Sequence, residues 1–92
     1  MIISFKCPDT ESLFVTGRSR RFANIKIIAE RKLTQLEAAV SLASLKAPPG
    51  NRLEALSGNR KGQHSIRIND QWRLCFVWTH KGLIDVAIVD YH

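Results

Sequence analysis

The chain has 92 residues, 45% of them hydrophobic, and its 14 Lys and Arg residues outnumber 8 Asp and Glu residues to leave a net charge of +6. This length predicts a single domain over residues 1–92 that buries roughly 64% of its surface on folding. The hydrophobic fraction excludes a disordered chain. The charge favours a polyanionic partner, which could be nucleic acid, an anionic membrane or an acidic protein.

Other classes are excluded by patterns that the sequence lacks. No stretch approaches the ~20 apolar residues of a membrane span, and the first residues have neither the basic start nor the apolar run of a signal peptide. Cys7 and Cys75 do not share metal-ligand spacing with the scattered histidines, so we expect no metal and no cofactor. We expect a reducing cytoplasm, with Cys75 as a small core residue.

The N-terminal part predicts a strand and a short helix. Residues 1–5 are largely apolar and precede Pro8, which ends a strand. Asp9 is the expected N-cap of a helix that runs through Thr16, and Gly17 is suited to the position after its end.

A second helix is predicted over about 21–39, continuing or restarting through residue 45. Apolar residues recur there at three- and four-residue steps, which is typical of a helix packed on a core. The two prolines and the glycine of residues 46–51 end it. A compact basic patch precedes the helix and consists of Arg18, Arg20 and Arg21.

The remaining chain predicts an antiparallel meander with strands over 52–56, 63–68, 72–78 and 83–89. A three-residue turn over 69–71 places Ile66 opposite Leu74 and Arg67 opposite Arg73, whereas a two-residue turn would mix apolar and charged partners. Two facing arginines repel each other unless an anion lies near them. This register therefore predicts a phosphate site on the sheet.

The last strand ends in three polar residues, Asp90, Tyr91 and His92. They supply a carboxylate, a phenol and an imidazole that titrates near neutrality. Alternation along this strand places Ile84, Val86 and Ile88 on the core face and Val89 and Tyr91 on the arginine face. We expect the alternation to fail at Asp90 and His92, where the chain leaves the sheet.

These pieces together resemble the RelE/ParE superfamily of bacterial toxins, and the HigB-type branch in particular. Members of that branch run from a Met-Ile-x-Ser-Phe start to an Asp-Tyr-His end, as this chain does. The similarity covers essentially the whole chain, and the stretches that carry it are residues 48–56, 58–67, 69–73 and 89–92.

The resemblance implies an α+β, RelE-like fold: an antiparallel or mixed β-sheet with an N-terminal strand and two to three helices packed on one face. It implies the toxin of a type II toxin–antitoxin system, an endoribonuclease that enters the ribosomal A site and cuts messenger RNA. It also implies a helix-turn-helix antitoxin of the HigA type as partner. Operator DNA would be bound only through that antitoxin, and no membrane is involved.

Family roles transfer to particular positions. Arg73 matches the sheet arginine that neutralises the scissile phosphate, and the terminal triplet Asp90, Tyr91 and His92 matches the catalytic tail. Glu54 is a departure, because some relatives carry a histidine there. The missing imidazole leaves Glu54 itself, His64 or His92 as candidates for acid or base chemistry.

RNA carries its own nucleophile, the 2′-OH, so cleavage requires a base, a cation for the phosphate and an acid for the 5′-oxygen. We expect His92 to donate or accept a proton, Asp90 to orient it or act as the base, and Tyr91 to stack on a nucleotide. The side chains expected to contact RNA or the ribosome are Arg60, Lys61, His64 and Arg67, with Arg18, Arg20 and Arg21 as a second basic contact.

Two rival functions remain open at this point. One is a non-catalytic poison of DNA gyrase, as in the ParE branch, and the other is a toxin that impairs ribosome assembly with little messenger cleavage. The Asp90–His92 tail argues against the first.

Overall fold

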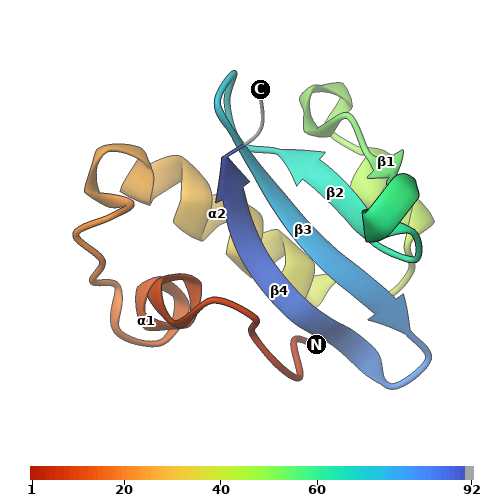
Figure 1. Cartoon of the computed structure of the whole chain (residues 1–92), viewed down its shortest axis with the longest axis horizontal. Coiled ribbons are helices and arrows are strands. Elements are labelled where there is room, and N and C mark those ends of the chain that lie inside the picture. The colour runs from red at the N-terminus through yellow and green to blue at the C-terminus, as the bar shows by residue number, and fades with distance from the viewer. Residues whose placement is uncertain (91–92) are drawn as a thin grey trace.

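The computed structural model describes residues 1–90; Tyr91 and His92 lie outside the described residues. The antiparallel sheet has the order β1-β2-β3-β4. Figure 1 shows α2 behind this sheet and α1 beside the β4 edge, so that the opposite sheet face is free of long helices. The α+β class is confirmed. The helices and strands are α1 (Pro8–Thr16), α2 (Lys26–Ala38), β1 (Glu54–Ala55), β2 (His64–Arg67), β3 (Trp72–Thr79) and β4 (Gly82–Asp90), and four short 3₁₀ turns are η1 (Ala23–Ile25), η2 (Ala43–Lys46), η3 (Pro49–Asn51) and η4 (Gly58–Arg60).

The β2–β3 hairpin has the predicted register. Ile66 pairs with Leu74 and Arg67 pairs with Arg73. The turn is held by Asn69, whose side-chain oxygen accepts hydrogen bonds from backbone N–H groups at 2.8 and 2.9 Å. The parity argument from the apolar pattern is therefore confirmed, and with it the position of Arg73 on the face away from α2.

The register of β4 differs from the prediction in its first half. Asp85 has a left-handed φ of 55° and lies at an irregularity in the β3–β4 pairing. Such a bulge inserts one residue and changes which side chains face the core. Leu83 is therefore fully buried, while Ile84 is only partly buried, so the expected core position of Ile84 was wrong. Beyond the bulge, Val86 and Ile88 are buried as predicted.

The end of β4 keeps its backbone pairing while the side chain of Asp90 is exposed. Asp90 pairs with Trp72, and its carboxylate accepts a hydrogen bond from Gln71 Nε2 at 3.2 Å. The backbone pairing thus continues through Asp90, but the Asp90 side chain is exposed and not in the core, so the alternation of side chains fails there as expected. The expectations for Tyr91 and His92 fall outside the described residues.

Residues 1–5 follow β4 but form only two isolated parallel bridges, Ile2 with Leu83 and Phe5 with Val86. The backbone N–H of Leu83 donates to the carbonyl of Met1 at 2.9 Å. The predicted N-terminal strand is therefore reduced to these bridges, because hydrogen bonding is interrupted beside the bulge. The segment nonetheless covers the outer edge of β4.

The helices begin at positions other than those predicted. Cys7 rather than Asp9 is the N-cap of α1, because Pro8 occupies the first helical position, which suits a residue without an N–H. Gly17 ends α1 with a φ of 73°, as predicted. The second helix starts at Lys26, after the η1 turn, and not at residue 21.

The core lies between α2 and the sheet. Leu33 and Leu36 from α2 are fully buried, as are Leu74 and Phe76 from β3. Burying each such side chain contributes about 1.5–3 kcal/mol. This packing holds β3 and β4 rigidly and so positions the side chains on the other sheet face.

The loop between α2 and β1 is fixed by one buried polar residue. Asn51 is fully buried, and its amide donates to the carbonyls of Leu45 and Ala47 at 3.1 and 3.2 Å. Its oxygen accepts a hydrogen bond from Lys32 Nζ. Burial, with a smaller contribution from the charge of Arg31, lowers the pKa of Lys32. No helix within residues 1–90 is long and apolar enough to cross a membrane.

Candidate active site

Strand alternation gathers one set of side chains on the sheet face away from α2. Because Ser65 pairs with Cys75 and Cys75 pairs with Ala87, these residues share that face. Arg67, Arg73 and Val89 share it for the same reason. The sequence-predicted Arg73 therefore lies on the one broad face that no long helix covers (Figure 1).

Arg73 is buried and held from several sides. Its Nε donates to Ser65 Oγ at 2.8 Å, and one terminal nitrogen donates to the carbonyl of Arg52 at 2.7 Å and to that of Ser65 at 3.3 Å. The same nitrogen lies 3.8 Å from a carboxylate oxygen of Glu54, whose side chain is 51% exposed. The guanidinium is thus fixed in orientation, with a half-exposed carboxylate beside it.

Arg67 faces Arg73 but has its own acidic neighbour. Its guanidinium forms an ion pair with the exposed carboxylate of Asp70 in the β2–β3 turn. Glu54 and Asp70 thus provide negative charge beside the two arginines, so the facing guanidinium groups do not by themselves require a bound anion. The phosphate site on the sheet stays a prediction that the repulsion of the two arginines does not by itself establish.

A cavity of about 350 Å³ lies over β3 and β4 on this same face. Its lining comes from three parts of the chain: Cys75, Ala87 and Val89 from the strands, Lys6 and Cys7 from the N-terminal segment, and Arg60 and Gln63 from the loop before β2. Arg21, Asp85, Ile88 and Asp90 also line it. Three cationic side chains therefore surround a hollow next to the end of β4.

The positive charges of two arginines act on the thiol of Cys75, which lines this cavity. Burial raises the pKa of the Cys75 thiol, and the positive charges of Arg60 and Arg73 offset part of that rise. Both guanidinium groups are therefore close enough to act on the same atom. Arg60 lines the cavity together with Cys75, whereas Arg73 does not.

The structure places the two cations predicted to contact RNA from the loop over 57–62, Arg60 and Lys61, in different surroundings. Arg60 is partly buried and donates to Gln63 Oε1 at 3.4 Å. Lys61 is exposed and does not line the cavity. Only Arg60 of this pair is thus brought to the strand face.

His64 lies on the other side of the sheet. It pairs with Phe76, whose side chain is in the core, and the two rings stack with centroids 6.3 Å apart. The imidazole borders an apolar groove with Leu42 and Leu53, and its Nδ1 is buried with no hydrogen-bond partner among the described residues. The structure does not bring His64 together with Arg73.

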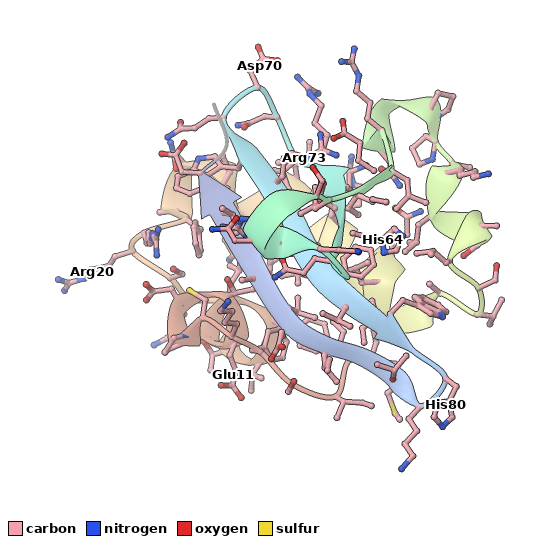
Figure 2. All side chains as sticks on the ribbon, turned by 45° about the vertical axis from the view of Figure 1, so that its right-hand side comes forward. Glu11, Arg20, His64, Asp70, Arg73 and His80 are labelled. Carbon is pink, nitrogen blue, oxygen red and sulfur yellow. The ribbon has the colours of Figure 1, made fainter. Side chains whose placement is uncertain are left out.

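The arginines of the basic patch before α2 lie at two different hollows. Arg21 lines the cavity, with its guanidinium carbon 5.3 and 5.8 Å from the ring centroids of Phe22 and Trp72. Arg18 and Arg20 border a separate hollow between α1 and the start of α2. Figure 2 shows Arg20 extending away from the body of the protein.

Sequence reasoning missed Lys6 and Asp85, which also line the cavity. Lys6 carries no local signal, because only the parallel course of residues 1–5 along β4 brings it to the sheet face. Asp85 depends on the bulge. Within residues 1–90, no group of three His, Cys, Asp or Glu residues is arranged to hold a metal ion.

Comparison with known proteins gives concordant results. Residues 11–92 match the family described as "RelE-like toxin of type II toxin-antitoxin system HigB". The chain is 41% identical to "Toxin HigB-1" of Vibrio cholerae over 80 residues, which cover 85% of this chain and 84% of that protein. It is also 35% identical over 54 residues to an uncharacterized protein of Haemophilus influenzae, covering 59% and 54% of the two chains.

The fold is also found among solved structures. A chain of the "YoeB-YefM complex from Staphylococcus aureus" superposes with a TM-score of 0.58 at 20% identity, covering 100% of this chain and 98% of that one. At this identity the likeness concerns the fold alone. The family match over residues 11–92 and the 41% identity to a HigB toxin show more: the chain belongs to the HigB family of RelE-like toxins of type II toxin–antitoxin systems.

Proposed function

We propose that this toxin is a ribosome-dependent endoribonuclease that cuts messenger RNA in the ribosomal A site and thereby stops translation. One observation carries the proposal: a cation-lined cavity lies on the uncovered sheet face next to Asp90, the residue that Tyr91 and His92 follow in the sequence. A positively charged groove that tracks a backbone is the usual means of binding single-stranded nucleic acid.

The chemistry follows from the 2′-OH of RNA, which attacks the neighbouring phosphorus while the 5′-oxygen departs. His92 would protonate that oxygen, and Asp90 would orient His92 or accept the 2′-OH proton. Glu54 is the alternative base, since its half-exposed carboxylate lies 3.8 Å from the Arg73 guanidinium. Tyr91 would stack on a nucleotide at the cut.

Arg73 would stabilise the charge that develops on the phosphate. Its guanidinium is already oriented by Ser65 and by the carbonyl of Arg52. A cation held in place before the reaction needs no reorganisation in the transition state, and removing one such contact typically costs about 3–4 kcal/mol of transition-state stabilisation.

Other cations would hold the RNA backbone or the ribosome. Arg60 and Arg67 lie on the strand face, and Lys61 lies in the exposed loop next to Arg60. Arg18 and Arg20 would form a second contact. His64 is left out of this proposal, because its ring stacks on the core residue Phe76.

The proposed partner in the resting cell is a helix-turn-helix antitoxin of the HigA type. The chain of similar fold was solved in a complex, the "YoeB-YefM complex from Staphylococcus aureus". A basic toxin with a net charge of +6 suits an acidic partner surface. Operator DNA would be contacted through the antitoxin only.

The test is to compare H92A with H80A in a translating system. His80 lies in the β3–β4 turn, at the opposite end of the strands from Asp70 and hence from the proposed site (Figure 2). A single general acid contributes about 10²–10⁴-fold, so we expect H92A to lose cleavage by that factor while H80A cuts at the normal rate. Equal cleavage by both variants would contradict the assignment. Uncut transcripts with DNA damage, or with abnormal ribosomal subunits, would support a gyrase poison or an assembly inhibitor instead.

A further inference from the structure

The cavity over β3 and β4 is lined by Asp90 and Arg60, which the proposed function already uses, and also by residues that it does not use, among them Lys6. Cys75 and Ala87, which pair with each other and have small side chains, both line it. Its volume of about 350 Å³ lies near the lower end of the range for small-ligand pockets, roughly 300–1,000 Å³. The hollow therefore suits one nucleotide-sized group.

Two cations border this cavity from opposite parts of the chain. Lys6 belongs to the segment that follows the edge of β4, where its backbone N–H donates to the carbonyl of Val86 at 3.0 Å. Arg60 belongs to η4, before β2. In the part of the chain that the structure describes, neither Lys6 nor Arg60 forms an ion pair. Each is thus a positive charge that a bound anion would neutralise.

A third cation, Arg21, is held at the rim. Its guanidinium contacts the ring of Trp72 and lies 3.8 Å from a carboxylate oxygen of Asp9. Such contacts limit the movement of a long side chain. The carboxylates of Asp85 and Asp90 line the cavity as well, so its three cations leave an excess of one positive charge, and Lys6 and Arg60 are the two cations that form no ion pair among the described residues.

The cavity is continuous with the proposed catalytic groups. Val89 lines it and pairs directly with Arg73 across β3 and β4. Asp90, the first residue of the polar tail, lines it as well. An RNA strand whose cleaved phosphate lies at Arg73 would thus place a neighbouring nucleotide at the cavity.

We propose that this cavity binds a backbone phosphate of single-stranded RNA, adjacent to the phosphate that is cut, between Lys6 and Arg60. We favour a phosphodiester over a protein carboxylate as the ligand, because Lys6 and Arg60 line a hollow that also reaches Asp90 and, through Val89, adjoins Arg73. The inference rests on the proposed function for the identity of the ligand. Lys6 becomes a substrate-binding residue that no sequence motif indicated.

The experiment measures binding rather than cleavage, so that the two proposals can fail separately. The full-length toxin is titrated into a short fluorescent single-stranded RNA in which every 2′-OH is methylated, at several salt concentrations. The variants are K6Q and R60Q, and the matched control is K81Q, which removes an exposed charge in the turn between β3 and β4.

We expect K6Q and R60Q each to weaken binding by about tenfold, the effect of losing one charge-assisted contact. The slope of log K against log salt should become less steep by about 0.7 for a lost phosphate contact on a single strand. K81Q should retain the normal slope. Because Lys6 is exposed, K6Q should also melt at the wild-type temperature.

The proposal is overturned if K6Q and R60Q bind like K81Q, or if the wild-type toxin shows no salt-dependent binding to this RNA. It is also overturned if the two variants weaken only the complex with the antitoxin. If RNA binding is lost as expected but the wild-type toxin leaves messenger RNA intact on ribosomes, the phosphate site stands and the proposed nuclease function fails.

Discussion

Arg67 and Arg73 lie directly opposite each other on β2 and β3, yet each guanidinium is close to a different carboxylate. Arg67 pairs with Asp70 in the adjoining turn, while Arg73 is fixed by Ser65 with Glu54 beside it. The protein thus places negative charge next to two like charges on one sheet face. It follows that Arg73 has a structural task as well as the proposed catalytic one.

Replacing Arg73 should therefore affect stability and activity together. R73A leaves Ser65 Oγ and the carbonyl of Arg52 without their donor, and an unsatisfied buried polar group costs about 1–3 kcal/mol. We expect a loss of about 2–4 kcal/mol in the free energy of unfolding on the same basis, measured by urea denaturation. An R73A variant as stable as the wild type would contradict the structural role.

Replacing Glu54 distinguishes the structural role of this site from its proposed catalytic role. Its side chain is 51% exposed and 3.8 Å from Arg73, so E54Q should change the free energy of unfolding by less than about 1 kcal/mol. If Glu54 is the base, ribosomal cleavage falls by about 10²–10⁴-fold in E54Q. Unchanged cleavage would assign the base to Asp90.

Gly82 permits the N-terminal segment to lie along β4. Its φ is 145°, and a Cβ there would lie 2.5 Å from the carbonyl oxygen of Met1. We expect G82A to destabilise the fold by more than about 1 kcal/mol, because neither the backbone angle nor the space suits alanine. G50A is the matched control, since a Cβ at Gly50 meets no atom within 4 Å. Equal melting temperatures for the two variants would refute this account of the β4 edge.

Cys75 predicts a dependence of stability on pH. Burial raises the pKa of its thiol in the folded protein, so above about pH 8.5 the unfolded chain loses this proton before the folded one does. The unfolded state then binds fewer protons, and stability falls as pH rises. Urea denaturation from neutral to alkaline pH should show a steeper decline for the wild type than for C75A. Parallel curves would contradict the raised pKa.

The sequence predicted the parts of the fold that depend on simple alternation. The turn over 69–71 and the pairing of Arg67 with Arg73 follow from keeping Ile66 and Leu74 on the same face. Alternation failed at Asp85, because a bulge adds one residue without a distinctive change in composition. Ile84 was therefore assigned to the core in place of Leu83.

The candidate site was predictable only where its residues belong to the strands. Arg73 was identified from register and resemblance, and the structure places it on the uncovered face. Lys6 and Arg60 meet at the cavity through the path of two irregular segments, which no periodic pattern records. His64 was a candidate because Glu54 leaves the site without the histidine that some relatives carry, but His64 lies an even number of residues from Ile66 and is therefore on the core face.

The central claim is that this toxin cuts messenger RNA on the ribosome. The direct measurement is primer extension on a defined transcript in a purified translation reaction, with and without the toxin, and with free transcript as the control. We predict cuts at defined codon positions that require both translating ribosomes and the toxin, and that disappear when the antitoxin is added. A full-length transcript on ribosomes that have stopped translating would contradict the claim.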